Sequence, residues 1–464
     1  MSDRREENEE KTVLRLQNQQ PSLWEAVLPP EVFCLSEELA AIDRLLDDER
    51  FLNPFLERFN TRIGRPTVPV AIYLRLMYLK RRYQLGYETL VKEVTDSFSW
   101  RRFCRLSIDD PLPEATTLIK LTHKYGEAML RDLNDTLLRK LKEGKVIRGR
   151  KLRVDTAVTE ANIHYPTDTG LLADGIRLIT RTVGKIRKAG IEIGKRFVNH
   201  MRTVKKTSLG LMKVMKKRVR KDHPDMIAAR ATLSRVAEEV VADGCKINSY
   251  IGTLADMPPR IQRLTKQLGE WVTVTGKIIE QTRKVIDGCR HIPRRIVSLF
   301  DRDARPIRRG KLRVDTEFGH KVLIGETDHG IITTYKVVQE NPADTTLLKP
   351  AVQGHKRLFR RTLKAVAADR GFSSRENEMW LHTHGVTKAS IPSRGKVTKE
   401  RRCYQHQAWF KRLQRFRAGI EARISLLQRK FGLKRSLMRG TQGTEIWVGQ
   451  AIFAHNLWQA ARIL

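Results

Sequence analysis

The chain has 464 residues, of which 40% are hydrophobic, and its 89 Lys and Arg against 52 Asp and Glu give a formal net charge of +37. The length predicts more than one domain, and the apolar content excludes a wholly disordered chain. The charge predicts a polyanionic partner, most commonly DNA or RNA, although composition alone also allows a ribosomal or packaging protein or a surface kept soluble by lysine.

Neither the N-terminus nor the cysteines point to export or to the membrane. The sequence MSDRREENEE lacks the apolar core of a signal peptide, and no apolar run reaches the roughly 18 residues of a membrane span. The five cysteines are scattered without C-x-x-C spacing, which argues against a disulfide framework or a zinc site. We therefore expect an intracellular protein.

The N-terminal region predicts helices. Residues 1–22 are charged and glutamine-rich and predict a flexible tail, and a helical domain follows over 23–145. Two short helices are expected around residues 96–97, the second bearing Arg101 and Arg102, as in helix-turn-helix modules that bind DNA; a plain helical bundle with a solvated basic face is an equal alternative. Large apolar residues repeat at intervals of three and four, as on an amphipathic helix, at Val70, Tyr73, Leu74, Met77 and Tyr78.

At Lys151 the pattern changes. KLRVDTAV alternates and is rich in β-branched residues, which predicts a strand. A helical insertion is expected over residues 171–290. Two apolar stripes within it, joined near Asp222-His223-Pro224, predict antiparallel helices packed as a hairpin.

The insertion carries a one-sided basic run. Between Met201 and Lys221 the sequence has nine Lys or Arg and no Asp or Glu. A charge run is usually a solvated face, but one so one-sided on a projecting hairpin would suit contact with phosphates. Six of its cations are the candidate DNA contacts: Lys205, Lys206, Lys213, Lys216, Lys217 and Arg218.

Strand character returns after Ile296. Segments 318–325 and 331–339 predict a β-hairpin that turns at Asp328-His329-Gly330. Asn341 to Asp344 predicts the capped start of a helix, and the apolar run Val366-Ala367-Ala368 predicts a strand buried on both faces. Ser373 with Glu376 predicts a capping box for the next helix, before a strand over 386–391 and a long helix over about 405–431. This order predicts an α/β fold with a mixed sheet.

Three carboxylates fall where this order would bring them together. Asp155 lies in the first strand, Asp369 ends the buried strand at the edge where open α/β sheets bind ligands, and Glu421 flanks the apolar stripe of the long helix. Cleaving a phosphodiester needs an activated nucleophile and charge neutralisation, which two Mg²⁺ ions on carboxylates supply. Taken singly, each acid is as readily explained by an ion pair or a helix cap, so only the joint placement favours a site.

A repeat complicates the choice of first acid. KLRVDT occurs at residues 151–156 and again at 311–316, so Asp315 is a rival to Asp155. Asp315 lies in a Gly/Arg-rich connection just before a strand, and we therefore prefer Asp155. Asp301 and Asp303 predict a turn. The histidines lack H-E-x-x-H spacing and predict structural or surface groups rather than metal ligands.

Several segments resemble bacterial insertion-sequence transposases of the DDE class. They are KLRVDTAVTEANIHYPTDTGLL, FGHKVLIGETDHGIITTYKVVQENPADTTLLKPAVQGH, AADRGFSSRENEMWL and RFRAGIEARISLLQRKFGLKRS, and GRPTVPVAIYLRLMYLKRRYQLGYETL is similar to the N-terminal helical domain of that family. The resemblance implies an RNase H-like catalytic domain over 146–464, interrupted by the insertion. It also implies Mg²⁺ dependence, with Mn²⁺ able to substitute, and metal-ligand roles for Asp155, Asp369 and Glu421.

The resemblance further implies that Arg370 and Arg417 contact DNA near the site. Some relatives have a tyrosine three residues before that arginine and a lysine seven after the glutamate, where this chain has Gln414 and Gln428. The implied function is strand cleavage at insertion-sequence ends and transfer into target DNA. The implied partners are double-stranded terminal repeats and target DNA, bound by a homodimer or higher oligomer that is cytoplasmic and nucleoid-associated. The alternatives are an RNase H-like nuclease or resolvase that does not join strands, and a non-catalytic DNA-binding protein derived from a transposase.

Overall fold

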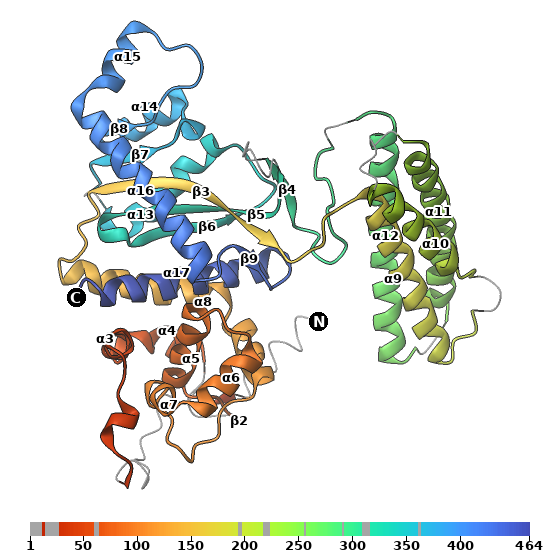
Figure 1. Cartoon of the computed structure of the whole chain (residues 1–464), viewed down its shortest axis with the longest axis horizontal. Coiled ribbons are helices and arrows are strands. Elements are labelled where there is room, and N and C mark those ends of the chain that lie inside the picture. The colour runs from red at the N-terminus through yellow and green to blue at the C-terminus, as the bar shows by residue number, and fades with distance from the viewer. Residues whose placement is uncertain are drawn as a thin grey trace. The chain divides into compact units, whose positions relative to one another are not determined.

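In the computed structural model the chain forms two compact units (Figure 1). Unit 1 comprises Met1–Asn162 and His320–Leu464, and unit 2 comprises Ile163–Gly319. The structure describes residues 12–13, 27–59, 65–193, 197–216, 223–254, 257–289, 292–308, 316–360 and 363–464. The rival acid Asp315 and the candidate DNA contacts Lys217 and Arg218 lie outside the described residues.

The N-terminal part of unit 1 is helical, as the sequence predicted. The predicted pair of short helices is confirmed, because Ser97 ends α6 and its side chain accepts a hydrogen bond from the Trp100 amide to cap α7. A short parallel pair, β1 (Thr12–Val13) with β2 (Arg65–Pro66), accompanies the helices. The helical elements are η1 (Pro30–Phe33), α3 (Glu37–Leu46), η2 (Glu49–Phe51), α4 (Asn53–Leu56), α5 (Val70–Arg82), α6 (Tyr87–Asp96), α7 (Phe98–Phe103) and α8 (Ala115–Glu143).

The sheet is mixed, with the parallel strands at its centre. Its order is β4-β5-β3-β7-β8, with β6 paired to β5 and β9 to β3. β3 pairs in parallel with β7 and β7 with β8, whereas β5 and β6 form the predicted antiparallel hairpin. This is the mixed α/β, RNase H-like sheet that the sequence predicted. The strands are β3 (Lys151–Ala161), β4 (Arg305–Arg308), β5 (Thr316–Glu326), β6 (Ile332–Val338), β7 (Ala365–Ala368), β8 (Lys388–Ser390) and β9 (Arg435–Ser436).

The remaining helices of unit 1 pack on this sheet and on the N-terminal helices. In Figure 1, α16 crosses the strands of the sheet, and α17 runs beside α8. Among the described helices, none combines the length and apolar character that crossing a membrane requires. The elements are η3 (Asp328–Gly330), η4 (Asp344–Leu347), α13 (Leu348–Phe359), η6 (Arg370–Phe372), α14 (Arg375–Thr383), α15 (Lys399–His406), α16 (Ala408–Lys430) and α17 (Gly440–Ala461).

Two predicted helix starts are displaced along the chain. The structure begins helix at Asp344 after Ala343 and not after Asn341, because Asn341 has φ 52° and not the extended conformation of an N-cap residue. The next cap is Ser374, whose hydroxyl accepts from the Asn377 amide, so the predicted Ser373 cap is wrong by one residue. Both errors are local, and neither changes the order of elements.

The last predicted helix is divided. The stretch expected as one long helix is α15 followed by α16, separated by Gln407 in a non-helical conformation at ψ 143°. The predicted apolar stripe of α16 is confirmed, since Leu413, Ile420, Ile424 and Leu427 are buried. Its buried face fixes which side chains of the helix turn toward the sheet.

Unit 2 is built around a bundle of helices. The helices are α9 (Asp168–Lys188), α10 (Met201–Lys216), α11 (Pro224–Gly252) and α12 (Pro259–Ile286), and they share one apolar core (Figure 1). The two predicted stripes lie on α9 and α11, which contact each other. A simple hairpin of two helices is wrong, however, because α10 lies between them along the chain and contributes Val204 and Leu211 to the core.

Candidate active site

Two of the predicted acids are placed at one sheet edge by the strand register. Val154 of β3 is the partner of Ala368 of β7, and the next residues along these parallel strands are Asp155 and Asp369. Asp155 Oδ1 accepts a hydrogen bond from the Thr156 amide at 2.8 Å. Two parallel strands in this register thus bring the two carboxylates to the same place.

Asp369 is held by the turn that follows its strand. Its side chain caps η6, where Oδ1 accepts a hydrogen bond from the Gly371 amide at 2.7 Å. The other oxygen, Oδ2, lies 3.9 Å from Arg417 Nη2. The carboxylate therefore has one oxygen fixed by backbone and one directed toward α16.

Arg417 joins the third acid to the other two. It lies on α16 one turn before Glu421, and its Nη1 donates to Glu421 Oε1 at 2.8 Å. Its Nη2 donates to Asp155 Oδ2 at 3.0 Å. One guanidinium therefore pairs with all three predicted acids, which come from β3, the end of β7 and α16. The three differ in exposure: the Asp155, Asp369 and Glu421 side chains are 14%, 35% and 66% exposed.

A buried ionic cluster connects the strand and the helix that carry two of these acids, β3 and α16. This cluster was not predicted from the sequence. Glu326, at the end of β5, is fully buried and pairs with both Arg153 of β3 and Arg423 of α16. The Arg153 guanidinium also lies over the Phe416 ring, 4.6 Å from its centroid. A side chain at Gly419 would meet the Arg153 guanidinium, which would have to move from its place beside α16. The cluster fixes the helix that carries Arg417.

Gln414 forms a second attachment of α16 to the sheet. Its Nε2 donates to the Ser390 carbonyl at 2.7 Å and lies 3.0 Å from the Ser390 hydroxyl, at the end of β8. This residue stands where some relatives have a tyrosine. In this chain it secures the helix to the strand ends rather than projecting from the surface.

The predicted DNA contacts fall into two groups. Arg370 and Arg102 are exposed, and so are four lysines of α10: Lys205, Lys206, Lys213 and Lys216. Arg101 is buried, and its guanidinium donates to the carbonyls of Ser107, Ile108 and Asp110. Arg101 therefore closes the loop after α7 and does not present its charge on the surface, contrary to the prediction.

The acids have the chemistry that a divalent cation requires, but not its geometry. Carboxylate oxygens are the donors that Mg²⁺ prefers, and these three already converge on one cation. Within the described part of the chain, however, no three His, Cys, Asp or Glu side chains lie close enough together to hold a metal ion as they stand. The three carboxylates are suitable ligands for the metal, but the Arg417 guanidinium bridges them.

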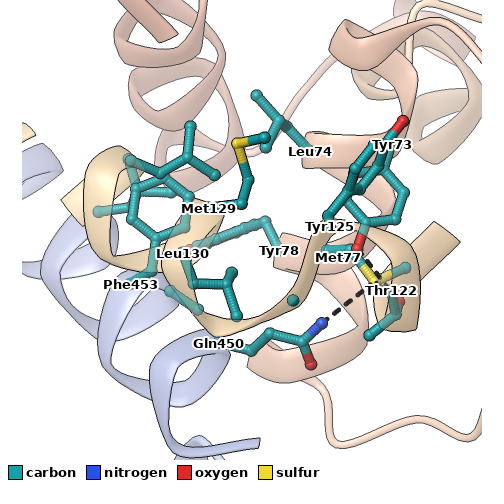
Figure 2. A pocket seen from close by; sticks show the side chains of 14 residues that line it. Tyr73, Leu74, Met77, Tyr78, Thr122, Tyr125, Met129, Leu130, Gln450 and Phe453 are labelled. Atoms are coloured by element: carbon teal, nitrogen blue, oxygen red, sulfur yellow. Dashed lines mark hydrogen bonds between the residues drawn. The ribbon is translucent and has the colours of Figure 1, made fainter. Parts of the chain in front are cut away.

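A hollow elsewhere in unit 1 carries no such chemistry. It lies between α5, α8 and α17 and is lined mainly by apolar and aromatic side chains (Figure 2). Its polar lining residues are Tyr73, Tyr78, Thr122, Tyr125 and Gln450, and its lining contains no carboxylate or histidine. It adjoins the point where α8 departs from helical geometry, at Gly126 with φ 68° and ψ −170°.

Comparison with protein families identifies the class. Residues 30–124 match the transposase domain (DUF772), and residues 301–457 match the transposase DDE domain. No solved structure matches the chain. With its RNase H-like sheet and helical N-terminal region, the chain is an insertion-sequence transposase of the DDE class. The family is one of DNA-binding enzymes that generally use divalent metal ions.

Proposed function

We propose that this transposase cleaves DNA at insertion-sequence ends and joins the freed 3′ end to target DNA, using Asp155, Asp369 and Glu421 as metal ligands. The observation that carries the proposal is their convergence on Arg417 from three separate elements. If each acid merely formed its own structural ion pair, there would be no reason for three acids from distant segments to share one cation. Asp155 is preferred to its repeat-related rival Asp315 because β3 is a central strand that pairs with β7.

Asp155, Asp369 and Glu421 would hold two Mg²⁺ ions, or Mn²⁺ in their place, and the bound metal would supply activation of the attacking oxygen and charge neutralisation at the leaving oxygen. The chain positions them through strand register and helix packing. Asp369 is oriented by the Gly371 amide, and α16 is fixed by Glu326 and Gln414. A site on rigid elements keeps its carboxylates in place while the DNA strands move.

The DNA partner is proposed to contact the exposed basic surfaces. Among the described residues, no carboxylate forms an ion pair with Lys205, Lys206, Lys213 or Lys216 of α10, so their charges are open to phosphates. Arg370 lies directly after Asp369 and is exposed at the same sheet edge. We propose terminal repeats and target DNA as the duplexes bound, by a homodimer or higher oligomer.

The test uses amide replacements of the acids. Asp155→Asn, Asp369→Asn and Glu421→Gln should each abolish Mg²⁺-dependent cleavage of a duplex carrying the element's end, and also strand transfer from a precut 3′-hydroxyl end. DNA affinity in a gel-shift assay should remain within about threefold, since these residues carry no positive charge. Glu160→Gln, on the same strand as Asp155 but paired with Arg435, is the matched control and should keep activity.

Each alternative has its own outcome in this experiment. Cleavage without strand transfer in the unaltered protein would indicate a nuclease or resolvase, and no metal-dependent cleavage would indicate a non-catalytic DNA-binding protein. Full activity of Asp155→Asn with loss in Asp315→Asn would move the first ligand to the second copy of the repeat.

A further inference from the structure

We propose that Arg417 is a displaceable counter-ion: it competes with metal for the three carboxylates, and its release onto a DNA phosphate couples metal binding to DNA binding. The inference rests on the proposed function, because it takes Asp155, Asp369 and Glu421 as the metal ligands. It adds a role for this chain's own arginine in deciding when the metal enters.

The competition follows from the atoms that Arg417 engages. Its guanidinium holds Asp155 Oδ2 at 3.0 Å and Glu421 Oε1 at 2.8 Å, and Asp369 Oδ2 lies 3.9 Å away. A magnesium ion needs oxygens of several carboxylates at about 2.1 Å around one point, and the guanidinium already bridges the same three carboxylates, so the two cations compete for one place. Within the described residues the carboxylates are accordingly too far apart to hold an ion. Metal entry requires the guanidinium to leave and the acids to close in.

The charge balance explains why the arginine occupies this place in the metal-free protein. Three carboxylates near one another repel, and the positive charge of the guanidinium offsets part of that repulsion. One positive charge against three negative charges still leaves a net negative site. Divalent cations neutralise the cluster more completely than the guanidinium does.

The arginine also has an incomplete set of partners in this state. Arg417 Nε is buried and has no hydrogen-bond acceptor among the described residues. A buried donor without an acceptor destabilises the arrangement that contains it. A phosphate offers two oxygens to a guanidinium in a forked arrangement, and this would satisfy Nε together with one Nη. DNA at the site therefore favours the released arginine, and the released arginine leaves the carboxylates to the metal.

Coupling of this kind is reciprocal, so DNA must raise metal affinity as much as metal raises DNA affinity through this residue. The experiment measures Mn²⁺ binding by calorimetry, first to the DNA-free full chain. Arg417→Gln should bind Mn²⁺ about tenfold more tightly than the unaltered protein, within the range typical of coupled sites. Arg417→Lys, which keeps the charge but cannot bridge three acids, should fall between them. Arg415→Gln removes an exposed arginine of the same helix and is the matched control, with unchanged affinity.

The second measurement repeats the titration with a short duplex bound. DNA should strengthen Mn²⁺ binding to the unaltered protein and to Arg415→Gln, but not to Arg417→Gln. Equal or weaker Mn²⁺ binding by DNA-free Arg417→Gln and Arg417→Lys would overturn the inference. If Asp155→Asn, Asp369→Asn and Glu421→Gln all keep unaltered Mn²⁺ affinity, the assignment of the metal ligands itself fails. The two failures are therefore distinguishable.

Discussion

Arg153 and Glu326 form a buried ion pair across the two central strands β3 and β5, with Arg153 Nε 3.0 Å from Glu326 Oε2. Glu326 is fully buried, and Arg423 of α16 approaches the same carboxylate at 3.3 Å. Because a fully buried charge is costly without partners, the two strands and the helix are held in one arrangement. The helix that carries Arg417 and Glu421 is therefore positioned by an acid that takes no part in the proposed chemistry.

Breaking this pair should destabilise unit 1. Glu326→Gln leaves two guanidinium groups without their carboxylate, and loss of a buried partner costs about 3–5 kcal/mol. Urea unfolding followed by tryptophan fluorescence should show a lower midpoint for unit 1. The control is Glu160→Gln, which breaks the exposed pair with Arg435 and should change stability by less than about 1 kcal/mol. Equal midpoints for the two variants would show that the buried cluster does not fix the core.

Stability should also rise with pH through a buried lysine. Burial, and then the adjacent Arg81, lower the pKa of Lys80 from 10.5 to about 7. In the unfolded chain the amine regains its ordinary pKa, so between pH 7 and pH 10.5 the unfolded state holds a proton that the folded state has lost. Unfolding therefore becomes harder as pH rises, by about 2 kcal/mol between pH 7 and pH 9.

The lysine prediction is checked by denaturation at several pH values. Lys80 lies over the rings of Tyr87 and Trp447, and Lys80→Met keeps an apolar side chain of similar length against them. The variant should lose this pH dependence while the unaltered protein shows it. If the unfolding free energy depends on pH equally in both proteins, groups other than Lys80 cause the dependence.

The break in α8 predicts a cost for the smallest possible substitution. Gly126 has φ 68° and ψ −170°, a conformation that is essentially restricted to glycine, and an added Cβ would meet no atom within 4 Å. Gly126→Ala should thus lose about 1–3 kcal/mol through backbone strain alone. Gly276→Ala in α12 also meets open space but has helical geometry, and it should stabilise unit 2 by up to about 1 kcal/mol. Calorimetric scans of both variants check the opposite signs.

The basic face of α10 gives a prediction for DNA binding. Replacing Lys205, Lys206, Lys213 and Lys216 with Gln should weaken binding to duplexes of any sequence and reduce the salt slope by up to about 0.9 for each phosphate that the variant no longer neutralises. Helix propensity is similar for the two residues, so unit 2 should keep its stability. The control removes the same charge from exposed positions of α12: Arg260, Arg263, Lys266 and Lys277. An unchanged salt slope in the α10 variant, or the same reduction in the α10 and α12 variants, would show that α10 is an ordinary solvated surface.

Local patterns in the sequence were enough to predict the central strands, the hairpin and the apolar stripe of α16. They did not predict α17, because that helix is buried on nearly every side, from Ile446 to Trp458, and so lacks a polar face to mark its period. The displaced caps at Ala343 and Ser374 show the same limit on a smaller scale. Lys321, which is remote in sequence, donates to the Pro342 carbonyl and to Asp344 at the first of these helices, and a local pattern does not show such contacts.

The sequence predicted the members of the candidate site but not the ion pairs that connect them. Asp155, Asp369 and Glu421 each had a signal in strand or helix position. The bridging of all three by Arg417 depends on the packing of α16 on β3 and β7, which no spacing reveals. Glu326 was overlooked although a signal existed: it is an acid that directly follows the apolar run VLIG of a strand.

The adjacency of β3 and β5 in the sheet has a consequence for how the chain folds. The helices of unit 2 lie between these two strands in sequence, so their pairing must close a very long loop. The entropic cost of closure grows only with the logarithm of loop length, and a bundle that has already collapsed on its own core shortens the effective loop further. During synthesis the bundle leaves the ribosome before β5 does. Unit 2 is therefore expected to fold early and independently, and the central sheet, with its carboxylates, to assemble only after most of the protein has been made.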